Sequence, residues 1–137
     1  MIRFITFLCF SLMAVGCSSR SAKFEPVVSD IQSGVLVAHT NGAVRLPAKF
    51  ASLTPDGQVF VEKKPDGSLF ILFPTWYGRG NDLDGILYCS RALLPSDYYT
   101  TDWGAGGKQQ HIDVGGRDML TIHDYKTHWY KVSRRLD

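Results

Sequence analysis

Short runs of β-branched and aromatic residues, separated by polar turn sequences, fill the chain after residue 34. Residues 68–73 are apolar on both faces, which predicts a central strand. About eight such runs, with a turn every ~10 residues, predict an all-β domain built as a small antiparallel barrel, sandwich or meander. The predicted strands are residues 35–39, 43–46, 58–62, 68–73, 86–94, 111–114, 118–123 and 128–134.

Pairs of Asn or Asp with Gly mark the expected turns, because these residues tolerate positive φ. Asn41-Gly42 predicts a hairpin that joins strands 35–39 and 43–46, and Asp84-Gly85 predicts a turn before strand 86–94. After residue 16, no helix-length window repeats apolar residues at helical spacing, although residues 46–53 have room for one helical turn.

The first 16 residues have a different pattern. One cation, Arg3, precedes an apolar run from Phe4 to Val15. This run is shorter than the ~20 apolar residues that a spanning helix needs. A cation, a short apolar core and small residues at its end are typical of a secretory signal peptide.

The segment Ala14-Val15-Gly16-Cys17 resembles the lipobox of bacterial lipoproteins, with Ala14 where Leu is usual. The resemblance implies cleavage after residue 16 and acyl chains on the sulfur of Cys17. Such chains hold a protein on a membrane without a spanning helix. Because Ser18 rather than Asp follows the cysteine, the resemblance also implies an outer-membrane location that faces the periplasm.

The expected domain organisation follows from this leader. Residues 1–16 are the signal peptide, residues 17–33 are the lipidated cysteine and a flexible tether, and residues 34–137 are a single β domain. The resemblance covers only the leader and Cys17, so it implies nothing about molecular activity.

Charge and cysteine content narrow the function further. The formal net charge is +2, and it falls to +1 when Arg3 leaves with the leader, so no basic surface predicts a nucleic-acid partner. Of the three cysteines, Cys9 leaves with the leader and Cys17 is acylated, so Cys89 has no partner for an internal disulfide. Cys89 lies in an apolar run, which predicts a buried core residue.

Histidines and aspartates gather near the C-terminus and are the candidates for catalysis. Strand alternation places His111 and Asp113 on one face, and His123 ends a strand just before the expected turn that begins at Asp124. A small envelope hydrolase with a His/Asp site is therefore the alternative hypothesis for function. No complete catalytic motif and no cofactor-binding motif is present in the sequence.

Asp82 and Asp84 resemble the first half of a calcium-binding loop. In that alignment the first and twelfth ligand positions are Gly80 and Arg91, so two of the carboxylates that hold the ion are missing. The sequence therefore favours a solvated turn over a metal site.

Aromatic residues in the expected loops are the candidates for binding. Large aromatic rings beside carboxylates can stack on sugars or grip a peptide, and they can equally cap the ends of a small β core. The favoured hypothesis is a lipid-anchored envelope module that binds a protein partner or an envelope glycan. The candidate residues are Trp76, Tyr77, Tyr98, Tyr99 and Trp103.

Overall fold

The computed structural model describes residues 19–36, 41–102 and 107–135. The predicted signal peptide, Cys17 and Trp103 lie outside these ranges, and the side chain of Asp124 is also outside the description. No helix in the described ranges has the length and apolar character needed to cross a membrane.

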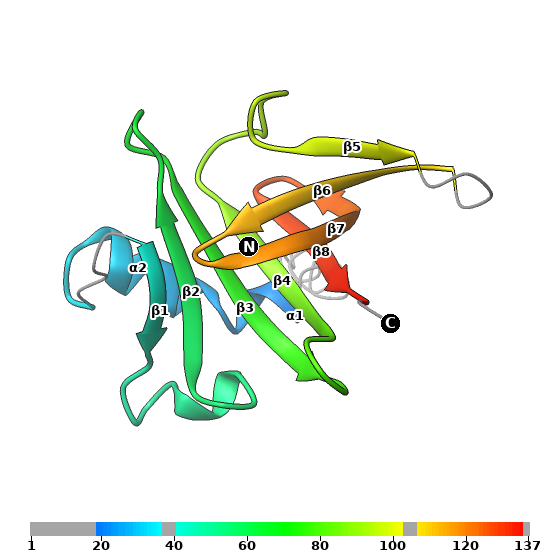
Figure 1. The fold of residues 1–137 in the computed structure, drawn as a ribbon. Coiled ribbons are helices and arrows are strands. Elements are labelled where there is room, and N and C mark those ends of the chain that lie inside the picture. Colours follow the sequence, from blue (N-terminus) through cyan, green and yellow to red (C-terminus); the bar gives the residue numbers. More distant parts are fainter. Residues whose placement is uncertain (1–18, 37–40, 103–106, 136–137) are drawn as a thin grey trace, which may run out of the picture.

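The domain is built on one antiparallel sheet of eight strands in the order β1-β2-β3-β4-β8-β7-β6-β5 (Figure 1). The all-β prediction is therefore confirmed. Two four-stranded meanders meet where β4 pairs with β8. The elements are helices α1 (Ser19–Ala22) and α2 (Glu25–Gln32), the 3-10 turn η1 (Ala51–Leu53), and strands β1 (Asn41–Arg45), β2 (Gln58–Lys63), β3 (Leu69–Tyr77), β4 (Leu83–Cys89), β5 (Tyr99–Asp102), β6 (Lys108–Val114), β7 (Arg117–Lys126) and β8 (Trp129–Arg134).

The sheet curls so that the second meander folds over the first, with β6 and β7 in front of β2 and β3 in Figure 1. A core fills the space between the two halves, with Phe70 and Leu72 from β3 facing Ile112 and Leu120 from β6 and β7. Strands β1 and β5 form the two ends of the sheet and do not pair with each other. The sheet is thus open, which fits the sandwich or meander among the predicted architectures.

The tip of the β6–β7 hairpin closes this inner core. A Cβ atom on Gly115 would lie 2.9 Å from the backbone nitrogen of Val61 and 3.0 Å from its carbonyl oxygen. Gly115 also has a φ of +57°, which glycine adopts at no steric cost. The hairpin turn therefore packs directly on the backbone of β2.

A second core lies on the outer side of the first meander, under helix α2. Phe24, Val27, Val28 and Ile31 occupy positions i, i+3, i+4 and i+7, so they form one apolar helix face. Phe24 has an exposed fraction of 0% and its ring stacks on Phe73 with 4.4 Å between centroids. The expected flexible tether over residues 17–33 is therefore wrong for this stretch, and the packed body begins at Phe24.

Two of the dipeptides that predict turns lie within strands instead. Asn41 and Gly42 lie in β1, where they pair with Glu62 and Val61 of β2. Asp84 and Gly85 lie within β4. Both dipeptides tolerate turn geometry, but here the ladder pairing with a neighbouring strand decides their conformation. The helical turn expected within residues 46–53 is confirmed by η1.

Candidate functional site

The candidate aromatic residues separate into inward-facing and outward-facing side chains. Tyr77 and Tyr98 pack against the inner core, and burial together with nearby Asp56 raises the pKa of Tyr77 to about 12. Trp76 and Tyr99 are the outward-facing pair, with exposed fractions of 45% and 40%. The prediction that these aromatics lie in loops is wrong for Trp76 and Tyr77, which end β3, and for Tyr99, which begins β5.

Trp76 and Tyr99 stand at the two ends of one row of paired residues across the sheet, which runs through Asp84, Ser133, Thr121 and His111. Strand β6 packs face to face on β2 and β3, so the outer side of the second meander points away from the outer side of the first. Helix α2 and Phe24 cover the outer side of the first meander. Trp76 is next to the place where the N-terminal segment enters, and Tyr99 is on the outer side of the second meander.

The surface around Trp76 is built by three neighbouring strands and the N-terminal segment. A β-bulge in β3 between Pro74 and Trp76 brings Trp76 opposite Asp84 of β4. The guanidinium of Arg135 donates to the carboxylate of Asp84 at 2.8 Å and lies 5.0 Å from the centre of the indole ring. We call this surface the Trp76 face; it comprises Lys23, Trp76, Asp84, Lys131 and Arg135.

Trp76 is held in place although it is exposed. A Cβ atom on Gly78 would lie only 2.2 Å from Cη2 of the indole, so the ring rests directly on Gly78. Beside it is an open hollow of about 450 Å³, whose lining includes Lys23, Asp84 and Lys131. A fixed aromatic ring next to a hollow with cations is suited to bind a ligand, because little side-chain entropy is lost on contact.

The surface around Tyr99 combines an exposed ring with a buried histidine. The ring of Tyr99 stacks on His111 with 5.5 Å between centroids, and its hydroxyl donates to Asp113 at 3.2 Å. Burial and the charge of Asp113 raise the pKa of Tyr99 above its ordinary value. We call this surface the Tyr99 face; it comprises Tyr99, Thr101, His111, Asp113 and Thr121.

His111, a catalytic candidate, has both ring nitrogens in hydrogen bonds. Nε2 is 2.7 Å from the hydroxyl of Thr101, and Nδ1 is 3.2 Å from the hydroxyl of Thr121. Asp113 accepts from the backbone N–H of Met119 as well as from Tyr99. The structure thus brings His111 and Asp113 to one face, as predicted; His111 is buried beneath the Tyr99 ring, and Asp113 is exposed.

The other histidines have different surroundings. Nε2 of His123 bonds with the hydroxyl of Ser133. Nδ1 of His128 is 2.8 Å from the carbonyl oxygen of Cys89, whose N–H donates to the carbonyl of His128 at 2.8 Å. This reciprocal pair ties the β7–β8 turn to the end of β4. The hypothesis of a His/Asp hydrolase site stays a prediction.

Cys89 and the aspartates of the calcium-like segment are accounted for by packing and pairing. Cys89 is fully buried in the inner core, and burial raises the pKa of its thiol far above the ordinary value. Asp84 is paired with Arg135, and the backbone of Asp82 closes the turn from Gly78. Within the described ranges, no three His, Cys, Asp or Glu side chains are grouped so that they could hold a metal ion.

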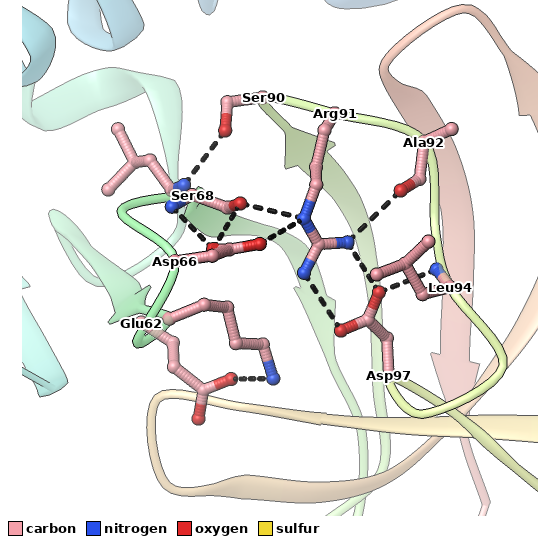
Figure 2. A network of polar contacts seen from close by, with 10 residues as sticks. Glu62, Asp66, Ser68, Ser90, Arg91, Ala92, Leu94 and Asp97 are labelled. Carbon is pink, nitrogen blue, oxygen red and sulfur yellow. Dashed lines mark hydrogen bonds and ion pairs between the residues drawn. The ribbon is translucent and has the colours of Figure 1, made fainter.

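A charged network fixes the segment that leads into β5 and its Tyr99 (Figure 2). Arg91 donates to both carboxylate oxygens of Asp97, at 2.6 and 3.1 Å, and to Asp66 at 2.8 Å. The hydroxyl and N–H of Ser68, followed by Arg91, lower the pKa of Asp66 to about 2. Arg91 likewise lowers the pKa of Asp97, whose side chain is only 5% exposed.

Asp97→Asn is expected to cost about 2 kcal/mol of unfolding free energy at pH 7, because it removes an ion pair with a nearly buried carboxylate. A carboxyl group with a lowered folded-state pKa stabilises the fold above its unfolded pKa of ~3.9. That stabilisation is lost as the pH falls through the folded-state pKa. The difference in unfolding free energy between wild type and Asp97→Asn should therefore become smaller as the pH is lowered from 5 to 2. Urea unfolding measures this difference.

Asp102→Asn is the matched control. Because this aspartate in β5 is exposed, its substitution should change the free energy of unfolding by less than about 0.5 kcal/mol at both pH 5 and pH 2. A difference for Asp97→Asn that is the same at both pH values would contradict the role assigned to the ion pair.

Comparisons with protein-family models, curated protein sequences and solved structures find no significant match to this chain. The functional argument therefore rests on the two faces themselves. Sequence reasoning found Trp76, Tyr99, His111 and Asp113. It did not connect Lys131 and Arg135, which are close together in the sequence, with Lys23 or with Trp76, because only the pairing of β3, β4 and β8 brings their surroundings together.

Proposed function

We propose that this protein is an envelope lipoprotein whose β domain is a binding module, held on the outer membrane by acyl chains on Cys17. The leader pattern supports the anchor. The observation that supports binding is the Tyr99 face, where an exposed ring is fixed by His111 below it and by Asp113 at its hydroxyl. Aromatic side chains held in this way are typical of binding hot spots.

The Tyr99 face is the surface that a partner in the periplasm reaches. It lies on the outer side of the second meander, whereas Phe24, where the chain that comes from the anchor enters the fold, packs on the outer side of the first. An aromatic ring with a polar rim suits an envelope glycan or a segment of a protein partner. Both ring nitrogens of His111 are engaged, so its geometry supports a positioning role under Tyr99.

Tyr99→Ala in the full-length lipidated protein is expected to lower retention of the partner at least tenfold, because an aromatic anchor contributes strongly to binding. Immobilised protein is mixed in separate experiments with purified cell-wall glycan and with solubilised envelope proteins, so the two partner classes give separate results. Trp76→Ala, outside the Tyr99 face, is the control and should keep full retention. Equal retention by Tyr99→Ala and wild type in both experiments would refute the Tyr99 face as the binding surface.

Mass spectrometry of the mature N-terminus tests the anchor separately. The expected first residue is Cys17 carrying a thioether-linked diacylglycerol, and Cys17→Ser should block both acylation and cleavage. An exported product that begins elsewhere and is free of lipid would refute the lipoprotein proposal.

A further inference from the structure

The distance between the anchor and the folded body limits how the domain can sit. Phe24 is locked into the outer core with an exposed fraction of 0%. Six residues lie between Cys17 and Phe24. The seven Cα-to-Cα steps that join the two residues span no more than about 25 Å when the chain is fully extended. If Cys17 is acylated, as proposed above, the surface around Phe24 therefore stays close to the membrane.

The Trp76 face is the surface next to this entry point. Lys23 directly precedes Phe24, and both line the hollow that is also bordered by Asp84 and Lys131. Arg135 lies against Trp76 and pairs with Asp84. Three cations and one carboxylate leave a net positive charge on the face, which is complementary to anionic headgroups.

Trp76 gives the face a second property that favours contact with a membrane surface. Tryptophan is favoured at the headgroup level, where its apolar ring and its N–H group are both accommodated. The indole is 45% exposed while Gly78 and Arg135 lie against it, so its conformation is already fixed before it contacts lipid. The cations nearby can bond with phosphate groups at the same depth.

We infer that the Trp76 face is the surface on which the domain rests on the membrane, where Lys23, Lys131 and Arg135 contact the phosphates of anionic phospholipids and Trp76 enters the headgroup layer. This inference rests on the proposed acylation of Cys17. It leaves the Tyr99 face turned toward the periplasm.

Fluorescence quenching by lipid tests this orientation. The full-length lipidated protein is reconstituted into vesicles of phosphatidylglycerol and phosphatidylethanolamine with bromine on the upper acyl carbons. Wild type should be quenched, and Trp76→Phe should lose most of that quenching. Trp129→Phe is the control, because it removes a half-buried ring of the outer core and keeps Trp76. Unchanged quenching in Trp76→Phe would overturn the inference.

A charge reversal tests the role of the cations. In wild type, the Trp76-dependent quenching should be at least twofold greater with phosphatidylglycerol than in purely zwitterionic vesicles. Lys131→Glu should abolish this difference. Lys108→Glu, an equal charge change at an exposed position of β6, should leave it intact. Equal responses of the two variants would overturn the inference.

Failure of the anchor and failure of the inference give different results. Acylated Cys17 with quenching independent of Trp76 refutes only the inference. If Cys17 is not acylated, the same protein is floated with phosphatidylglycerol vesicles, where about fivefold weaker binding of Lys131→Glu supports the face and absence of binding refutes it. Loss of glycan or protein retention in Trp76→Ala would assign the face to that partner and also overturn the inference.

Discussion

Phe24→Ala is expected to lower the free energy of unfolding by about 3–5 kcal/mol. The ring is fully buried between α2 and the outer side of the sheet, where it stacks on Phe73 and lies 6.4 Å from the ring of Trp129. Its removal leaves a cavity where the N-terminal segment joins the domain. Urea unfolding at pH 7 measures the loss.

Phe50→Ala is the control, since this half-buried ring packs against the same core. Its removal should lower the free energy of unfolding by less than half as much as Phe24→Ala does. A loss below 1 kcal/mol for Phe24→Ala would mean that residues 24–32 are not part of the cooperative fold. The distance limit between Cys17 and the domain would then no longer hold.

Gly115→Ala is expected to destabilise the domain by about 3 kcal/mol. Alanine at a φ of +57° costs about 1–2 kcal/mol. The added Cβ atom also meets the backbone of Val61 at 2.9 Å, and backbone atoms cannot move aside as a side-chain end can. The hairpin tip must lift from β2, which loosens the inner core.

Gly116→Ala separates the two causes. Gly116 has a φ of +91°, and nothing lies within 4 Å of its would-be Cβ atom, so only the backbone strain of about 1–2 kcal/mol should appear. Equal losses in the two variants would show that the contact with β2 contributes nothing.

Local pattern predicts most strands of this fold because alternation and turn chemistry act within a few residues. Residues 58–62, predicted as a strand, lie in β2, and the predicted strands 111–114 and 118–123 lie in β6 and β7. The end of β3 was missed because Pro74 cannot donate to a ladder and so predicts a strand end. In the structure Pro74 pairs with Gly85 at a bulge, and the strand continues to Tyr77.

Helix α2 was missed for a different reason. Its apolar residues have helical spacing, but they cover only eight positions next to an apolar leader and among polar residues. An isolated helix of this length is unstable in water, so it forms only because Phe24 and its neighbours pack on the sheet. The same dependence on tertiary structure hides both faces from the sequence, because the strands that build them pair across long stretches of chain.

The pairing of β4 with β8 has a consequence for how the chain folds. β4 ends at Cys89 and β8 starts at Trp129, so β4 keeps one edge without a hydrogen-bonded neighbour until the last strand has been synthesised. Contacts this distant in sequence make folding slow. Loss of the final dozen residues would remove β8 and leave β4 and β7 without the strand that pairs with both.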